Sequence, residues 1–244
     1  MRNIKIIIQY DGSRYHGWQK QPNAPTIQET VENAIAGVTG EKILLYGCGR
    51  TDAGVHAKYY VCHFFTDTRF DASRFKYAIN SRLPDDIVCI LSEEAEEGFD
   101  SRWSQSKTYT YLIQNSELPD VFLNKRAWHY CHPLDIDAMQ KAAKCFLGEH
   151  DFVGFASSGF TVKTTVRTIY SIDVTKEGDI IRIDVTGNGF LYNMVRIIAG
   201  TLVFCGSGKI NWREMTDIIN SCDRSRAGIT APPDGLYLSK VYYD

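Results

Sequence analysis

The order of strand-like and helix-like segments constrains this chain more than any other feature of its sequence. Alternating apolar residues predict a strand, and apolar residues three or four positions apart predict a helix. In the N-terminal part these patterns follow the order strand, helix, strand, strand, helix, strand. The expected elements are a strand at 4–10, a helix that begins at Thr26 and ends before Gly40, strands at 43–46 and 55–65, a helix from Asp71 to Leu83 and a strand at 87–92.

The C-terminal part repeats this order. The expected elements are a strand at 107–114, a helix at 135–147, a hairpin of strands at 166–175 and 180–186, a helix at 190–204 and a strand at 236–243, with a short helix at 212–221 inserted before the last strand. Such a unit is the ferredoxin-like motif, and two copies indicate an internal duplication. We therefore predict an α+β fold of two ferredoxin-like subdomains, residues 1–105 and 106–244, forming a largely antiparallel sheet with helices packed on one face. The alternative is that the two orders match by coincidence.

Composition and charge exclude several classes of protein. Hydrophobic residues make up 44% of the 244 residues and charged residues 23%, which is unlike a disordered or fibrous chain. The longest apolar stretch, residues 197–205, is far shorter than the ~18 residues of a membrane span. The start of the chain lacks a signal-peptide pattern, so we expect a cytoplasmic protein. With 27 basic and 29 acidic residues the net charge is −2, and any nucleic-acid site has to be a local basic patch.

The cysteines give no sign of a metal or redox centre. Seven are present, and no two are spaced as Cys-x-x-Cys, the spacing of common zinc and thioredoxin-like sites. The neighbours Cys62 and His63 would point to opposite faces of a strand. We therefore expect buried thiols in a reducing compartment and no metal site.

The segment from Gly47 to Ala57 is the densest cluster of residues without an evident structural role. Its three glycines allow a backbone that turns sharply or lies close to a ligand. Asp52 stands in its middle, two residues after Arg50. A guanidinium within ~4–6 Å would lower the pKa of the Asp52 carboxyl, and an ionised carboxylate on a tight loop can act as a nucleophile. The alternative is an aspartate that only caps the turn, with Arg50 as its local partner.

The strand at 107–114 places Lys107, Tyr109 and Tyr111 on one face. Two tyrosine rings and a cation on an exposed face can stack on an unpaired base and hold it. The alternative is a half-buried strand whose tyrosines belong to the core.

Arg196 is the only charge in the apolar helix expected at 190–204. An arginine in such a helix requires a carboxylate partner or a ligand. Asp52, in the other subdomain, is a candidate partner. The alternative is a surface arginine whose stem covers apolar neighbours while its charge stays in water.

Five segments together resemble the tRNA pseudouridine synthase A family. They are residues 10–19, 49–57, 107–111, 189–196 and 231–236. They stand in the family's order and extend over essentially the whole chain. The segment Gly-Arg-Thr-Asp-Ala-Gly-Val-His-Ala at 49–57 matches the family's catalytic motif without a gap and is highly specific, whereas the others are weak alone. At Val153 and Gly154 the family would have small hydroxyl residues, a departure that leaves the catalytic motif intact.

The resemblance implies a homodimeric enzyme without a cofactor that isomerises uridine to pseudouridine at positions 38 to 40 of the tRNA anticodon stem-loop. It implies that Asp52 is the nucleophile and that Arg196 is the basic partner that orients it. It also implies that Arg50 helps to flip the target base and that Tyr109 stacks on the flipped uracil. The further candidates for RNA contact are Lys107, His56, Lys58 and Arg14.

The expected reaction suits these residues. It breaks the bond between N1 of uracil and C1′ of ribose, rotates the base and rejoins it through C5. The base has to leave its stack, which costs a few kcal/mol, and an aromatic platform recovers ~1–3 kcal/mol. A carboxylate could add to C1′ or to C6 of the ring. The sequence leaves this choice open, and also whether Asp52 removes the proton from C5.

Two other classes of function fit parts of the sequence. A non-catalytic RNA-binding protein would bind tRNA without forming a product and would not need Asp52. A carboxylate-dependent enzyme acting on a small nucleoside would release free uracil. Such an enzyme usually has a second catalytic carboxylate nearby, and the loop contains none besides Asp52.

Overall fold

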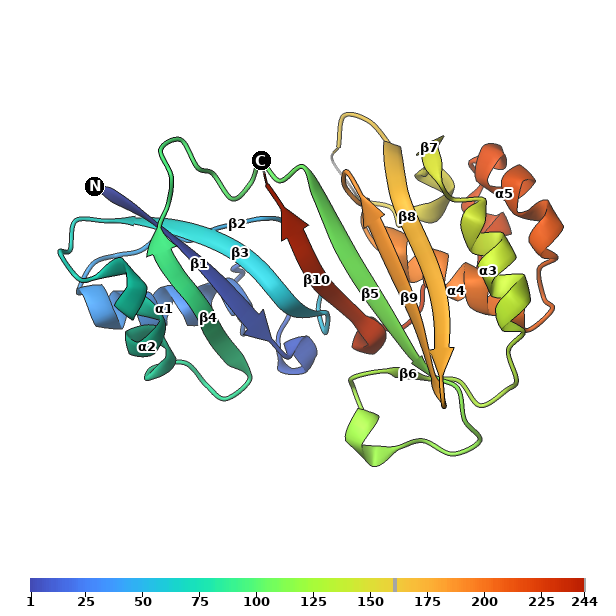
Figure 1. Cartoon of the computed structure of the whole chain (residues 1–244), viewed down its shortest axis with the longest axis horizontal. Coiled ribbons are helices and arrows are strands. Elements are labelled where there is room, and N and C mark those ends of the chain that lie inside the picture. Colours follow the sequence, from blue (N-terminus) through green and yellow to red (C-terminus); the bar gives the residue numbers. More distant parts are fainter. Residues whose placement is uncertain (160–161, 244) are drawn as a thin grey trace. The chain divides into compact units, whose positions relative to one another are not determined.

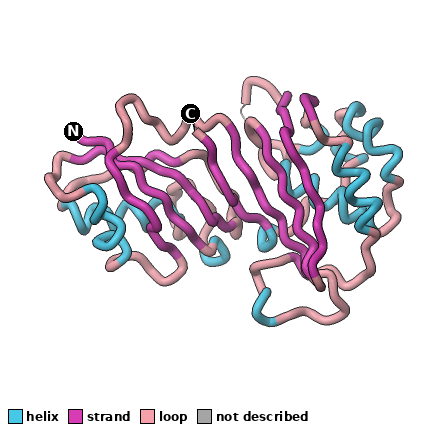
Figure 2. The backbone as a smooth tube through the Cα atoms, in the orientation of Figure 1, coloured by secondary structure: helices cyan, strands magenta, loops and turns pink. Residues whose placement is uncertain are grey.

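The computed structural model of the chain describes residues 1–159 and 162–243. The chain divides into two compact units (Figure 1). The first contains Met1–Gln105 together with the chain from Tyr237 on, and the second contains Ser106–Leu236. Both units combine strands and helices (Figure 2), and the strands pair mostly antiparallel, which confirms the predicted α+β class.

Within residues 1–105 the first unit has the predicted order of strands and helices, and it also contains most of the last strand, which was predicted for the second subdomain. Its elements are β1 (Arg2–Tyr10), α1 (Ile27–Thr39), β2 (Tyr46–Gly47), β3 (His56–Thr66), α2 (Phe75–Asn80), β4 (Ile87–Glu94) and β10 (Leu236–Tyr242). The sheet order is β4-β1-β3-β10, and β2 also pairs with β3. β1 is antiparallel to both of its neighbours, whereas β10 runs parallel to β3. Helices α1 and α2 lie on the same side of this sheet (Figure 1). Most of the last strand is thus counted with the first unit, because its backbone pairs with β3.

Helix α1 is bounded by the residues that predict it. Its N-cap Thr26 accepts a hydrogen bond from the backbone N–H of Glu29, and Gly40 ends it in a left-handed conformation at a φ of 73°, which favours glycine. Ile27, Val31 and Ile35 are fully buried. The helix therefore forms where a polar cap precedes an apolar stripe.

The strand expected at 43–46 is wrong except for its last residue. The N–H of Leu45 donates to Glu32 Oε1 at 3.0 Å, and the carbonyl of Leu45 accepts from Gln28 Nε2 at 3.1 Å. These backbone groups thus bond to side chains of α1, and only Tyr46 and Gly47 pair with β3. The second helix is also shorter than predicted, because Asp71 caps a 3-10 turn that precedes α2.

The second unit has a four-strand sheet in the order β5-β9-β8-β7, with β6 paired to β5. Its elements are β5 (Ser106–Gln114), β6 (Trp128–His129), α3 (Ile136–Lys144), β7 (Gly148–Asp151), β8 (Val166–Glu177), β9 (Ile180–Gly187), α4 (Met194–Gly206) and α5 (Met215–Ser221). The predicted hairpin is confirmed as β8 and β9. The short strands β6 and β7 were not predicted.

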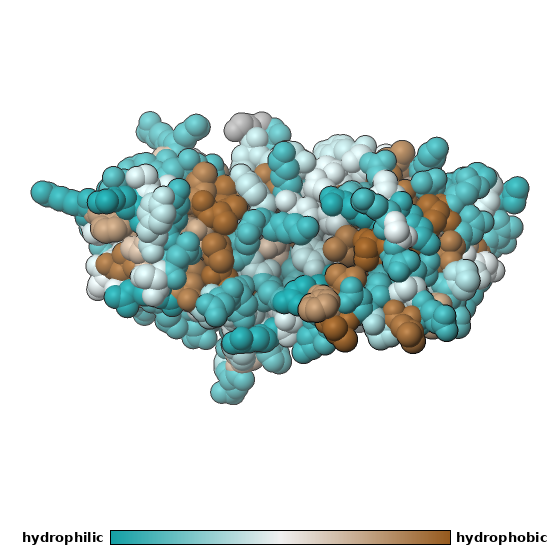
Figure 3. Space-filling model, turned by 60° about the horizontal axis from the view of Figure 1, so that its bottom comes forward, coloured by the Kyte–Doolittle hydropathy of each residue, from teal (hydrophilic) through white to brown (hydrophobic). Residues whose placement is uncertain are grey.

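Apolar side chains fill both units and also reach the surface at several separate places (Figure 3). Ile4, Ile6 and Ile8 of β1 are fully buried, as are Ile181 and Ile183 of β9. Within residues 1–159 and 162–243, no helix combines the length and the apolar character that a membrane span requires.

Candidate active site

The loop between β2 and β3 carries Asp52 in a tight turn of the first unit. It is fixed at its start, where the N–H of Cys48 donates to the carbonyl of Val61 at 3.0 Å and the hydroxyl of Tyr60 donates to the carbonyl of Gly49. At its end the N–H of Val55 donates to the carbonyl of Asp52 at 3.1 Å. Asp52 itself is half-buried. The turn therefore holds the aspartate just before β3 begins.

The segment at 10–19 lies directly against this loop. A Cβ atom on Gly12 would stand 2.0 Å from the carbonyl oxygen of Val55, and one on Gly17 would stand 2.5 Å from that of Thr51. Gly17 also has a φ of 86°, which favours glycine. The N–H of Trp18 donates to the carbonyl of Thr51 at 3.1 Å. The two motifs thus touch through their backbones, which only glycine permits at these positions.

Buried side chains support the same loop. The hydroxyls of Tyr10 and Thr51 are hydrogen-bonded at 2.8 Å, and both residues are buried. The rings of Trp18 and Tyr60 are stacked with their centroids 4.0 Å apart. The backbone that carries Asp52 therefore rests on a packed aromatic base.

Three of the predicted cationic contacts lie at the surface of the first unit. Arg50 is exposed, and its Nε donates to Gln19 Oε1 at 3.2 Å. Arg14 is exposed and pairs with Asp86, its Nε 3.3 Å from Oδ2. Lys58 is exposed with its Nζ over the ring of Tyr237. All three are placed where a polyanion can reach them.

His56 differs from these cations because it is only 2% exposed. Its Nδ1 accepts a hydrogen bond from the N–H of Gly12 at 3.1 Å, and its ring is stacked on Tyr237 with centroids 4.7 Å apart. This burial favours a role in holding the Asp52 loop and the segment at 10–19 together over the predicted contact with RNA.

The two tyrosines of strand β5 in the second unit differ in burial. Tyr109 is half-buried, and its ring lies edge-on to Phe190 with centroids 5.1 Å apart. Tyr111 is fully buried and donates to the carbonyl of Pro232 at 2.7 Å. Burial raises the pKa of the Tyr111 hydroxyl well above its usual value, so this donor stays protonated. Tyr111 is therefore a core residue, whereas Tyr109, like the half-buried Lys107, is partly accessible.

Arg196 lies in the first turn of α4, which begins four residues later than predicted because Asn193 adopts a left-handed conformation at a φ of 61°. The Nε of Arg196 donates to the carbonyl of Ala231 at 2.7 Å, and another guanidinium nitrogen donates to Asn193 Oδ1 at 2.6 Å. The side chain is half-buried. Arg196 is thus held by the protein and is not simply a solvated surface arginine. Its pairing with Asp52 stays a prediction.

Comparison with known proteins decides the family. The profile described as tRNA pseudouridine synthase matches residues 6–103 and 142–244. The chain belongs to the tRNA pseudouridine synthase family. Proteins named tRNA pseudouridine synthase A from Acetivibrio thermocellus and Thermoanaerobacter sp. are 52% and 49% identical to it, and a protein named tRNA pseudouridine synthase A 2 from Clostridium perfringens is 50% identical. Each comparison covers 100% of both chains.

Likeness to solved structures is weaker. A chain of the Cbf5-Nop10-Gar1 complex has a TM-score of 0.37 at 12% identity, with 96% of this chain and 57% of that chain covered. This likeness is too low to carry an argument. As a tRNA pseudouridine synthase the chain is an isomerase, and the family match contains both the Asp52 loop and Arg196.

One feature of this synthase was not predicted. A hollow of ≈ 280 Å³ adjoins Arg50, and its lining includes Tyr46 and Arg102. Neither residue stands in the segments that resemble the family, so the sequence offered no signal for it. In the described part of the chain, no group of three or more His, Cys, Asp or Glu side chains could hold a metal ion.

Proposed function

We propose that this tRNA pseudouridine synthase acts on uridines at positions 38 to 40 of the anticodon stem-loop, with Asp52 as nucleophile and the target base flipped out of the stem. The observation that carries the proposal is the placement of Asp52. It stands in a gap-free catalytic motif, on a turn locked by Gly12 and Gly17. A group held rigidly before the substrate arrives needs no reorganisation during the reaction.

The reaction rearranges one nucleoside without a co-reactant. The carboxylate of Asp52 either displaces N1 from C1′ or adds to C6 of the ring. On either route the bond between N1 and C1′ breaks and the uracil rotates. C5 then forms the new bond to C1′, and the bond from Asp52 to C1′ or C6 breaks, which regenerates the carboxylate. The proton on C5 is then lost and N1 gains one, so the product has the same atoms as uridine. Both routes need an ionised carboxylate close to the glycosidic bond.

The roles proposed for the other residues follow from a flipped base. Arg50, exposed beside the Asp52 loop, would occupy the space that the base leaves, and Tyr109 would stack on the extruded uracil. Arg196 would orient the Asp52 carboxylate. If Tyr109 acts by stacking, Tyr109→Phe retains most of the activity and Tyr109→Leu loses more, whereas equal losses would contradict stacking.

The test is the release of tritium from tRNA labelled with 5-³H-uridine in the anticodon stem-loop. The wild-type protein is expected to release it and Asp52→Asn, which keeps the shape of the side chain, is expected to release none. Mapping the product shows whether positions 38 to 40 are the ones modified. Full activity in Asp52→Asn would refute the nucleophile. Binding of tRNA without tritium release would favour a non-catalytic RNA-binding protein, and free uracil would indicate a hydrolase.

A homodimer in the cytoplasm is part of the same proposal, because a second subunit would give an L-shaped tRNA a longer binding surface. Light scattering at micromolar concentration is expected to give twice the 27.7 kDa of the chain. A monomer that is fully active would contradict it.

A further inference from the structure

The hollow beside Arg50 lies entirely within the first unit. Its lining includes Trp18, Gln19, Leu44, Tyr46, Arg50 and Arg102. We propose that this hollow binds one nucleotide of the substrate tRNA next to the reacting uridine, with Arg102 as the group that holds its phosphate. The inference deepens the proposed function and rests on it, because Arg50 connects the hollow to the Asp52 loop.

Charge makes the hollow attractive to a phosphate. Two guanidinium groups line it and no carboxylate does, although the net charge of the whole chain is −2. The acidic groups closest by are already engaged. Glu32 accepts from Gln28 and from the N–H of Leu45, and Asp100 accepts from Arg102. Because Asp100 pairs with Arg102 and offsets its charge, the net positive charge of the hollow comes from Arg50, and the hollow is a local basic site.

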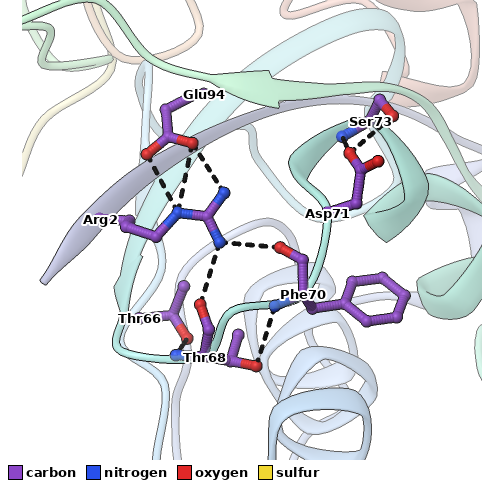
Figure 4. Close-up of polar contacts among 7 residues, drawn as sticks. All are labelled: Arg2, Thr66, Thr68, Phe70, Asp71, Ser73 and Glu94. Atoms are coloured by element: carbon purple, nitrogen blue, oxygen red, sulfur yellow. Dashed lines mark hydrogen bonds and ion pairs between the residues drawn. The ribbon is translucent and has the colours of Figure 1, made fainter.

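The bonding of Arg102 leaves a donor available. Its Nε and one terminal nitrogen donate to the carboxylate of Asp100, and its other terminal nitrogen has no partner among the described residues. Arg2 provides a contrast (Figure 4). It makes the same kind of fork with Glu94, but its remaining nitrogen donates to the carbonyls of Thr68 and Phe70. The donors of Arg2 are used by the protein, whereas Arg102 keeps one for a ligand.

Arg102 is also held ready in position. Its guanidinium lies over the ring of Tyr46 at 4.9 Å, and Tyr46 is stacked on His63 with centroids 5.0 Å apart. His63 is buried, and its Nδ1 is hydrogen-bonded to Ser101 Oγ at 2.9 Å. The hydroxyl of Ser101 in turn donates to the carbonyl of Tyr46 at 2.8 Å. A buried network thus ties together the two segments that carry Arg102 and Tyr46.

The chemistry and the size of the hollow fit a nucleotide. The remaining terminal nitrogen of Arg102 can donate to a phosphate oxygen, and the plane of an arginine stacks on bases. Leu44, 57% exposed, adds an apolar surface at the rim. Small-molecule pockets begin at about 300 Å³, so a hollow of ≈ 280 Å³ suits one nucleotide and not a helical stem.

The experiment compares Arg102→Ala with Arg2→Ala, which breaks a similar ion pair between residues that do not line the hollow. In Arg102→Ala we expect the KM for tRNA to rise about tenfold with kcat within about twofold, and the slope of log Kd against log salt concentration to fall by about 1, the loss of one phosphate contact. In Arg2→Ala we expect both quantities to stay at wild-type values. Arg102→Lys should keep the salt slope and recover part of the affinity.

An unchanged KM and salt slope in Arg102→Ala, or an equal change in Arg2→Ala, would overturn the proposal. If Arg102→Ala does not fold, the same measurements on Arg102→Gln and Arg102→Lys decide. Binding is also measured in the Asp52→Asn background. If the affinity for tRNA in this background still depends on Arg102, the inference stands even though the protein forms no pseudouridine. Failure of the proposed function and failure of this inference are then distinguishable.

Discussion

Asp52 in the first unit and Arg196 in the second are held in different ways. Main-chain contacts fix the backbone around Asp52, since the carbonyl of Thr51 accepts from Trp18 and the N–H of Gly54 donates to Tyr15. Arg196 is fixed by its own guanidinium, which donates to Ala231 and Asn193. The first arrangement depends on glycines that let two backbones touch. The second depends on charge-assisted hydrogen bonds, so different substitutions should disrupt the two regions.

Among substitutions that change how the two regions are held, the largest effect is expected from Gly12→Ala. The new Cβ would stand 2.0 Å from the carbonyl oxygen of Val55, and a backbone atom cannot rotate away. We expect activity to fall about 100-fold, since a shift of ~1 Å near the reacting groups costs that much. The unfolding free energy should fall by about 1–3 kcal/mol, as in other overpacked sites. Tritium release and urea unfolding measure the two effects.

Gly40→Ala is the matched control. Gly40 has a φ of 73° but open space where a Cβ would stand. The substitution should therefore lower the unfolding free energy through backbone strain alone, by about 1 kcal/mol. Its activity should stay within twofold of wild type. Wild-type activity in Gly12→Ala would show that the Asp52 loop does not depend on this close approach.

A loss of stability of similar size is expected from Arg196→Gln. The variant loses the charged donors to Ala231 and Asn193, and hydrogen bonds to charged groups contribute ~1.5–3 kcal/mol each to stability. We expect the unfolding free energy to fall by about 2 kcal/mol, read from urea unfolding. The exposed Arg213 serves as control, because Arg213→Gln removes a charge at the surface that lies over the ring of Trp212. Equal stability of both variants would mean that Arg196 is not fixed by its own side chain.

The features that local residues determine could be predicted from the sequence, and those that distant residues determine could not. The ends of α1 at Thr26 and Gly40 could be predicted, because capping and left-handed backbone geometry are local properties. The residues just before β2 have the sequence pattern of a strand. Their backbone groups are nevertheless hydrogen-bonded to side chains of α1, and no local sequence pattern indicates this.

The site shows the same division. The glycines around Asp52 and its motif predicted a functional loop. The contact of that loop with Gly12 and Gly17 joins segments far apart in the chain, and the burial of His56 follows from that contact. Arg102 stands in no motif, so the sequence did not single it out. Whether one of its N–H donors is free for a ligand depends on how its guanidinium bonds to Asp100 in the folded chain.

A smaller effect within the first region is expected from the buried pair of Tyr10 and Thr51, whose hydroxyls are 2.8 Å apart. Tyr10→Phe and Thr51→Val should each lower the unfolding free energy by about 1 kcal/mol, because each leaves a buried hydroxyl without this partner. The double variant should cost less than the sum of the two by ~0.5 kcal/mol or more, the coupling expected of residues in contact. Strict additivity would mean that this bond does not stabilise the loop.

The smallest effect concerns His63, behind Tyr46. Burial lowers the pKa of the His63 ring below its usual value, so the folded protein binds this proton less readily than the unfolded chain does. Its contribution to stability is therefore complete above about pH 6.5, the ordinary value for histidine, and is lost as the pH falls below it. Urea unfolding between pH 7.5 and about 5 should show a shallower loss in His63→Gln than in wild type.

His16→Gln, which removes an exposed histidine ring, is the control for the substitution itself. If the curve of His63→Gln runs parallel to that of the wild type, the ring gains its proton as easily in the folded protein as in the unfolded chain. The network of His63, Ser101 and Tyr46 would then be open to water. In that case it would not hold Arg102 rigidly in position.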